Sequence, residues 1–95
     1  MINAQRGETA IEIGGEAHML RLTLAALAEI ETGLGCDGLE ALGERLKRLD
    51  AAGLKLVLAA LLRGGGADEA DTLAGLAGPR AAAAAVADCF RTNLT

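Results

Sequence analysis

Residues 56–66 read Leu-Val-Leu-Ala-Ala-Leu-Leu-Arg-Gly-Gly-Gly, and this stretch decides the fold that we expect. Seven apolar residues run without interruption into Arg63, and three glycines then stop the helix. A helix over residues 54–63 is apolar nearly all the way round, which is typical of a central, buried element. The alternative is that Leu56 and its neighbours form an exposed contact patch.

Residues 7–22, upstream of this helix, have the pattern of a β-hairpin. Thr9, Ile11 and Ile13 alternate with glutamate or alanine, which is the period-two pattern of a half-buried strand. Gly14-Gly15 supplies two residues that tolerate the positive φ of a hairpin turn. A lone two-stranded hairpin is marginal in water, so it must pack on helices or pair with another chain's strand.

Capping residues and apolar spacing predict the remaining helices. Thr23 is a suitable N-cap for a helix over residues 24–32, with Leu24 in its apolar stripe and glycines at its end. Residues 37–40, Asp-Gly-Leu-Glu, match a capping box before an amphipathic helix that ends near residue 49. A short break at residues 50–53 then separates that helix from the central one.

Two more helices are expected after the glycine triplet. Asp68 is suited to cap a short helix that buries Leu73 and Leu76, and Pro79 is suited to the first turn of the last helix. The fold class we predict is therefore α+β, mostly α, with an N-terminal β-hairpin followed by a small bundle of four to five helices. We expect one domain over residues 1–95, with the hairpin at 7–22 and the bundle at 24–94.

The core must be built from small and branched aliphatic residues. The chain has 17 Leu and 21 Ala, against one Phe and no Tyr or Trp. Alanine removes little surface from water, so each helix contact is individually weak. Either the helices pack very closely through Ala and Gly faces, or a partner completes some of the apolar surface.

Composition also excludes several classes of function. The net charge is −4, the pI is about 4.8, and no basic cluster with stacking aromatics is present, which argues against nucleic-acid binding. The longest apolar run has seven residues, against the roughly 18 to 20 that a membrane span needs. Residues 1–6 lack the apolar segment of a signal peptide, so we expect a cytoplasmic protein with Cys36 and Cys89 reduced.

No residue pattern predicts an enzyme. His18 is the single histidine, and with two distant cysteines it gives no metal-site spacing. Glu29 and Glu31 lie about 200° apart on a helix, so they are not a carboxylate pair. The chain has no serine, and its threonines lack a base in any known motif. We therefore expect no catalytic residue, no metal and no cofactor.

The order of these segments resembles a known family. Residues 6–35 read RGETAIEIGGEAHMLRLTLAALAEIETGLG, residues 56–66 read LVLAALLRGGG, and an Ala-rich helix follows. Together they resemble the gene-transfer-agent family of tail proteins over about residues 6 to 92, most specifically at residues 20–29 and 61–66. That family is described both as a phage tail tube protein and as a phage tail-assembly chaperone. The resemblance brings no catalytic or partner-contact residues.

The two descriptions imply different structures. A tube protein joins sheet edges into rings and is strand-rich, whereas this chain has two expected strands, so the chaperone fits better. Such a chaperone, encoded by a gene transfer agent or prophage, binds a tail partner such as the tape-measure protein. The first alternative is a structural tail component that enters the particle through its hairpin edge. The second is a small regulatory or ligand-binding domain unrelated to phage.

The excess apolar surface of the central helix suggests where a partner binds. Our hypothesis is that one side of this helix and the following turn line the contact, through Leu56, Leu58, Leu62, Arg63, Gly64, Gly65 and Gly66. The partner is then the tape-measure or major tail protein, and assembly of the chain with itself is left open. The alternative is that these residues are plain core.

Overall fold

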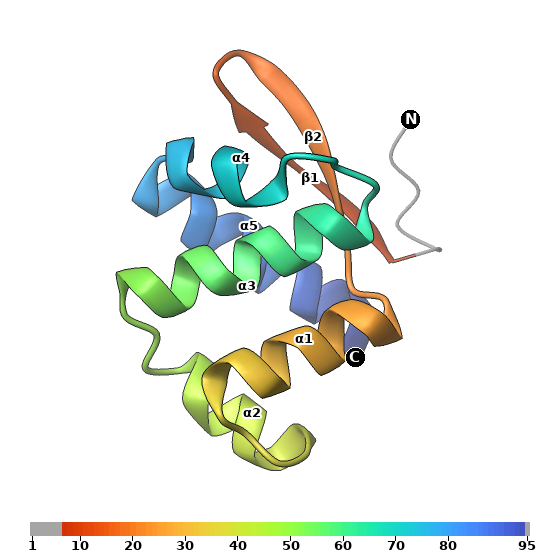
Figure 1. Ribbon diagram of the computed structural model, residues 1–95, viewed down its shortest axis with the longest axis vertical. Helices are drawn as coiled ribbons and strands as arrows, with labels where there is room; N and C mark the ends of the chain where they lie inside the picture. The colour runs from red at the N-terminus through yellow and green to blue at the C-terminus, as the bar shows by residue number, and fades with distance from the viewer. Residues whose placement is uncertain (1–6, 95) are drawn as a thin grey trace.

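The molecule consists of a β-hairpin followed by helices, as the sequence predicts. The computed structural model describes residues 7–94, without the side chain of residue 94, so the segment examined for a signal peptide lies outside the described residues. The described elements are β1 (Glu8–Ile13), β2 (Glu16–Arg21), α1 (Leu24–Leu34), α2 (Leu39–Leu46), α3 (Ala51–Gly64), α4 (Ala70–Leu76) and α5 (Pro79–Leu94) (Figure 1). The predicted fold class, α+β and mostly α, is confirmed.

The hairpin is closed by a two-residue glycine turn. Gly14 and Gly15 have φ values of 61° and 85°, and two successive positive φ angles are what a type I′ turn requires. Ile13 pairs with Glu16 across the turn, and the antiparallel register continues to Glu8 and Arg21. One face of the hairpin is buried, chiefly through Ile11, Ile13 and Leu20.

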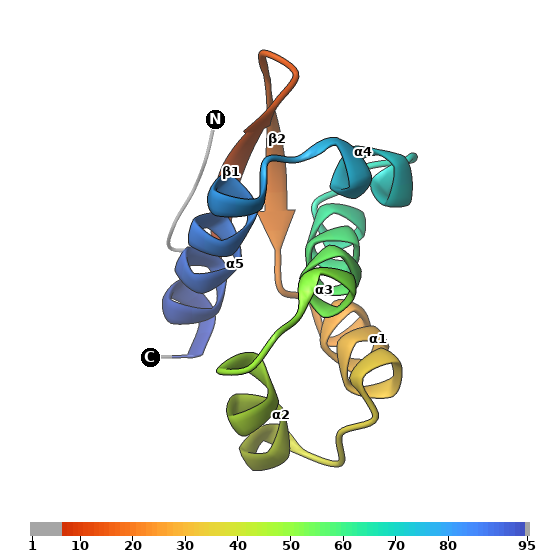
Figure 2. The same cartoon turned by 90° about the vertical axis from the view of Figure 1, so that its left-hand side faces the viewer.

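This buried face lies on two helices. β1 packs against α5, and β2 packs against α3, so the hairpin bridges the first and last parts of the helical bundle. Figure 2 shows the hairpin rising above α5 and α3, with α1 and α2 at the opposite end of the molecule. Asn93, near the end of α5, donates a hydrogen bond from Nδ2 to the carbonyl oxygen of Gly7 at 3.0 Å. The hairpin is therefore held at its base as well as along its face.

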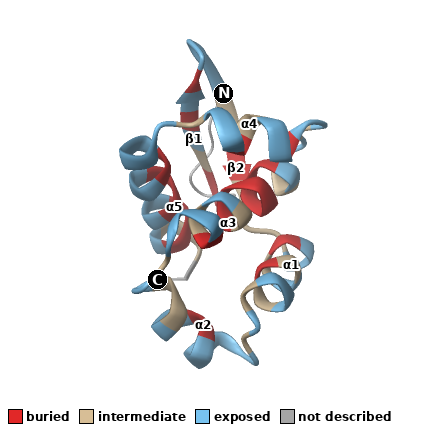
Figure 3. Ribbon diagram, turned by 60° about the vertical axis from the view of Figure 1, so that its left-hand side comes forward, coloured by how far each residue is buried: buried red, intermediate tan, exposed pale blue. Residues whose placement is uncertain are grey.

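Helix α3 is the centre of the core. It contacts α1, α4, α5 and β2, and six successive residues, Val57 to Leu62, are buried. Figure 3 shows this buried band along α3, whereas α2 and α4 are largely exposed. The expectation of a helix that is apolar all round and central is confirmed. It begins earlier than predicted, at Ala51, because the Asp50 carboxylate accepts a hydrogen bond from the Gly53 amide at 2.8 Å.

Close packing through small residues accounts for much of the core. Ala26 of α1, Ala59 and Ala60 of α3, and Ala74 of α4 are buried. A Cβ atom at Gly33 of α1 would lie 2.5 Å from a methyl carbon of Leu56, so the missing side chain lets α1 and α3 approach. The composition left open either close packing through Ala and Gly faces or completion by a partner. Close packing describes the contacts of α3.

Helix starts were predicted with mixed success. The Thr23 hydroxyl caps α1 by accepting a hydrogen bond from the Ala26 amide at 3.0 Å, as expected. The capping box at Asp37 is wrong, because Gly38 occupies the cap position with φ 93° and makes no side-chain cap bond. The cap at Asp68 is also wrong, because α4 begins at Ala70 and Glu69 takes the cap position. In both cases the aspartate lies one residue too early.

Two leucines that were predicted to be buried lie on the surface. Leu24 is 82% exposed and Leu76 is 70% exposed. Residues two apart on a helix point about 200° away from each other, and the buried positions nearby are Ala26 in α1 and Ala74 in α4. The smaller residue therefore faces the core and the leucine faces solvent. The glycine end of α1 is at Gly35, which has φ 70°, and α1 continues through Gly33.

Candidate functional site

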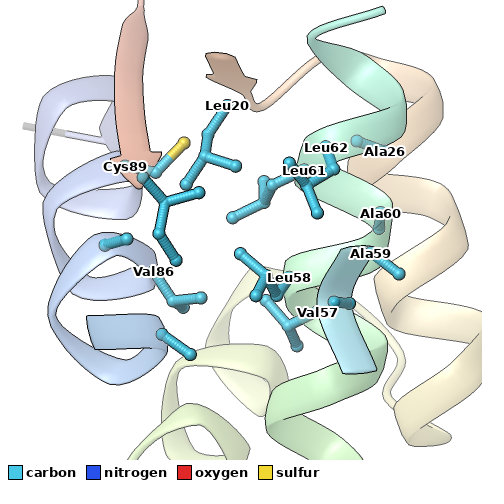
Figure 4. Close-up of a cluster of buried hydrophobic side chains, with 14 of the residues drawn as sticks. Leu20, Ala26, Val57, Leu58, Ala59, Ala60, Leu61, Leu62, Val86 and Cys89 are labelled. Atoms are coloured by element: carbon cyan, nitrogen blue, oxygen red, sulfur yellow. The ribbon is translucent and has the colours of Figure 1, made fainter. Parts of the chain in front are cut away.

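The predicted contact site lies at the C-terminal half of α3. Leu58 and Leu62 have no exposed surface, and Figure 4 shows both within the cluster formed with Leu20, Val86 and Cys89. A partner cannot touch these two side chains while the protein stays folded. These two side chains therefore occupy core positions rather than an exposed contact patch.

Leu56 differs from these two because it lies at the edge of the core. It is half-buried, and its methyl groups cover Gly33 of α1. The side chain lines a shallow, open hollow of about 640 Å³ between α1, α3 and α4, together with Ala25, Ala28, Glu29, Thr32, Gly33, Arg63 and Asp71. Leu56 is therefore a helix-packing residue with one accessible side.

Arg63, near the end of α3, forms ion pairs with α1 and with α4 at one end of this hollow. Its guanidinium forms an ion pair with Glu29 of α1 and a second with Asp71 of α4, at 3.3 Å. The hydrogen bonds that Arg63 donates to the Glu29 carboxylate raise the pKa of Arg63 further above its ordinary value. The three side chains are between 38% and 79% exposed, so each pair contributes at most about 1 kcal/mol. Arg63 is thus already engaged inside the protein.

The glycine triplet lets the end of α3 touch the backbone of β2. A Cβ atom at Gly64 would lie 2.2 Å from the carbonyl oxygen of Arg21, and one at Gly65 would lie 2.1 Å from that of Met19. Real Cβ atoms almost never come closer than 3.0 Å, so a larger residue at either position would force the two backbones apart. Gly66 has open space around it but a φ of 101°, which turns the chain toward α4.

A second hollow, which sequence reasoning missed, lies on the other side of α3. We call it the α2–α5 groove, and it is lined by Leu46, Lys47, Leu49, Leu54, Ala83, Val86, Ala87 and Phe90. Its volume is about 350 Å³, and Lys47 is its one polar lining residue. The sequence signal for it is the excess of alanine in α5, for which the composition left close packing and completion by a partner both open.

Comparison with known families identifies what kind of protein carries these features. A family model described as "Phage tail tube protein, GTA-gp10" matches residues 6–94. The chain belongs to this family. The resemblance to the gene-transfer-agent tail proteins, drawn from the sequence, is thereby confirmed. No curated protein and no solved structure matches the chain.

In the structure of this tail-family protein, most of the predicted contact residues make contacts within the chain. Leu58 and Leu62 are core, Gly64 and Gly65 are packing residues against β2, and Gly66 is a turn. The remaining two, at positions 56 and 63, have accessible surface but also serve contacts within the chain. Partner binding through these residues stays a prediction.

No group of three or more His, Cys, Asp or Glu side chains among residues 7–93 could hold a metal ion. Cys36 and Cys89 are free thiols, and burial raises the pKa of Cys89, which makes that thiol less reactive. None of the described helices is long and apolar enough to cross a bilayer.

Proposed function

We propose that this protein is a tail-assembly chaperone of a gene transfer agent or prophage, without enzymatic activity. It binds a partner in the tail, such as the tape-measure protein, before the tube is complete. The proposal rests on membership of the phage tail family together with a fold that is 63% helix and 14% strand over the described residues. On this proposal the protein acts in the cytoplasm and does not remain in the finished particle.

The single observation that carries the choice of chaperone over tube subunit is the covered edge of β2. A ring built by joining sheets needs two free edges in each subunit, one to give and one to receive. Here the outward carbonyl oxygens of Met19 and Arg21 lie against Gly65 and against Gly64, the last residue of α3. That packing favours a role in which the hairpin serves the protein's own fold.

Co-expression tests this proposal directly. The chain would be produced together with the tape-measure protein of the same gene cluster, and the products separated by size exclusion. A soluble complex, where the tape-measure protein alone aggregates, is the expected result. As a control, the major tail protein would be produced with the chain in the same way. Failure of the chain to keep the tape-measure protein soluble would refute the chaperone function.

A structural tail component is the second candidate, and the edge of β1 favours it. The residues that flank a two-residue turn form a hydrogen-bonded pair, and such pairs alternate along the ladder. Ala10 and Glu12 therefore belong to non-hydrogen-bonded pairs, opposite Met19 and Ala17 respectively, so their backbone groups point away from β2. Both residues are exposed, so a strand of another subunit could pair with this edge.

Proline substitution separates the second candidate from the first. Ala10→Pro removes an outward amide of β1 while leaving the hairpin ladder intact, and Ala17→Pro does the same on β2 as a matched control. If the protein joins tubes through β1, Ala10→Pro alone abolishes its incorporation into purified particles. Absence of the wild-type protein from particles would reject the structural role altogether.

A further inference from the structure

The α2–α5 groove is an apolar surface that the fold leaves uncovered. Its floor contains Val86 and Phe90, which are nearly buried, and its walls contain Leu46 and Leu49, which are half-buried. Helix α2 covers this region only in part, because Leu42 is its single buried residue and α1 is its main neighbour. In Figure 2, α2 lies apart from α5 at the lower end of the molecule.

The chemistry of the groove favours a helix as its occupant. Small-molecule sites combine apolar walls with several convergent polar groups, but this groove offers Lys47 alone. A bound strand needs a run of free backbone groups to pair with, whereas the groove residues other than Lys47 and Leu49 lie in helices, whose backbone groups are bonded internally. A helix satisfies its own backbone and needs only apolar side chains in the groove.

Helix α5 has the surface that a second helix needs. Ala83 and Ala87 are exposed and lie one turn apart on the groove side, where small side chains allow two helix axes to approach closely. The helix has 16 residues, so it offers a track of about 24 Å, or four turns. An apolar stripe on the partner can therefore pack along α5 and reach Phe90 and Leu46.

The charge around the groove specifies what flanks that stripe. Residues 44–50 and 79–94 carry five basic and three acidic side chains, whereas the other described residues carry three basic and ten acidic ones. Lys47 lines the groove and is paired with Glu44 at 3.1 Å, while Arg48 is exposed beside it. The two segments that supply most of the groove thus carry a net charge of +2 in an acidic protein, which is complementary to a helix with carboxylates beside its apolar face.

We infer that the α2–α5 groove binds an amphipathic helix of another protein, with its apolar stripe against Ala83, Ala87 and Phe90 and its acidic flank toward Lys47 and Arg48. That this helix comes from a tail protein rests on the proposed function, whereas its chemistry rests on the groove alone. The groove takes the place of the α3 surface as the site where a partner is held.

Two glutamate substitutions in α5 test the inference. Ala87→Glu places a carboxylate in the groove, and Ala84→Glu places the same group on an exposed position of the same helix outside it. The probe is a synthetic amphipathic helix of about 20 residues with glutamates beside its leucine stripe, and a second peptide has lysines instead. Binding to the full chain is followed by fluorescence anisotropy, and far-UV circular dichroism confirms that each variant is folded.

The expected result is binding of the acidic peptide that Ala87→Glu weakens about tenfold or more and Ala84→Glu leaves within about twofold, because only the former places a carboxylate in the apolar groove, next to the acidic flank of the peptide. Lys47→Glu, at a site 73% exposed, should weaken the acidic peptide and favour the lysine peptide. Equal binding to wild type and Ala87→Glu would overturn the inference, as would equal binding of the two peptides. A dimer that Ala87→Glu dissociates in light scattering would show that a second copy occupies the groove instead.

The same variants separate this inference from the proposed function. If the tape-measure protein binds wild type and Ala87→Glu equally, the groove is rejected as its site and the chaperone function stands. The opposite outcome is also possible. If the wild-type protein binds no co-expressed tail protein, the chaperone function is rejected. If it also binds the acidic peptide and Ala87→Glu abolishes that binding, the groove is still supported as a helix-binding site.

Discussion

Replacing Gly64 with alanine tests the contact between α3 and the hairpin. Gly64 is the last residue of α3, and helical glycines are normally improved by alanine by about 0.5 to 1 kcal/mol. Here the new Cβ would lie 2.2 Å from the carbonyl oxygen of Arg21, against a practical minimum of 3.0 Å. The two backbones must therefore separate by about 0.8 Å. The structure thus predicts the opposite sign to helix propensity.

The size of the effect follows from how little the neighbours can move. The clashing atom belongs to the backbone of β2, which is bonded to β1 and packed on α3 through the fully buried Leu20. Overpacking of this kind costs about 1 to 3 kcal/mol, which exceeds the gain in helix propensity. For a domain of this size each kcal/mol lowers Tm by about 4 to 8 °C. A net loss near 2 kcal/mol would therefore lower Tm by roughly 8 to 16 °C.

Thermal unfolding followed by circular dichroism measures this loss, and Gly43 provides the matched control. Gly43 lies within α2, and a Cβ atom there would meet nothing within 4 Å. Gly43→Ala should therefore raise Tm by a few degrees through helix propensity alone. Hydrogen exchange adds a local readout, because Gly64→Ala should raise the exchange rates of the β2 amides more than those of the α5 amides.

A Gly64→Ala variant as stable as wild type would refute the reasoning about the edge of β2. It would mean that the hairpin can move away from α3 at little cost, and the carbonyl oxygens of Met19 and Arg21 would then be accessible to another strand. That result would also remove the observation that favours a chaperone over a tube subunit. Loss of stability in both glycine variants would instead point to a general intolerance of substitution.

Four further outcomes are expected. Leu58→Ala should cost about 2 to 5 kcal/mol in chemical denaturation, because Leu58 is fully buried at the centre of the core. Asn93→Ala should cost about 1 to 2 kcal/mol by the same assay, since it removes the bond to Gly7 that holds the base of the hairpin. A thiol reagent should modify half-buried Cys36 in the folded protein and Cys89 only on unfolding. Because burial raises the pKa of Cys89, its contribution to stability should be complete below the ordinary value of 9.0 and decline as the pH rises beyond it.

Elements with strong periodicity could be predicted from the sequence. The alternation in β1, the glycine turn and the continuous apolar run of α3 each predict one kind of element. The structure has each of these elements at the predicted place. Pro79 was placed correctly at the start of α5, because proline is compatible with the first turn of a helix and not with its interior. These signals depend on neighbouring residues, so they survive without knowledge of the tertiary contacts.

The prediction that Leu24 and Leu76 are buried failed for a physical reason. In an Ala-rich helix either the alanine face or the leucine face can turn inward, and the choice depends on how closely the neighbouring helix approaches. Around α3 the approach is close, so Ala26 and Ala74 face the core while Leu24 and Leu76 face solvent. Sequence periodicity ranks residues by hydrophobicity and therefore selects the larger side chain at such positions.

The candidate site could not be predicted because its strongest sequence feature has a structural role. A glycine triplet after a helix indicates a turn or a ligand loop, and only the tertiary contact with Met19 and Arg21 reveals why two of the glycines are required. The α2–α5 groove had no motif at all. It arises from three segments that meet in space, near Leu46, Leu54 and Phe90, and none of them is unusual in isolation.

The composition left two alternatives open, close packing through small residues or completion by a partner, and the two ends of this molecule differ in that respect. Around α3, alanines and glycines allow α1, α4 and β2 to pack closely against this helix. Around α2, one fully buried leucine supplies only about 1.5 to 3 kcal/mol, while Leu46 and Leu49 keep apolar surface in water. A helix bound in the groove would cover that surface and hold α2 in place. The weakly packed end is therefore where binding gains most, since the partner's apolar side chains supply the burial that the chain's own alanines cannot.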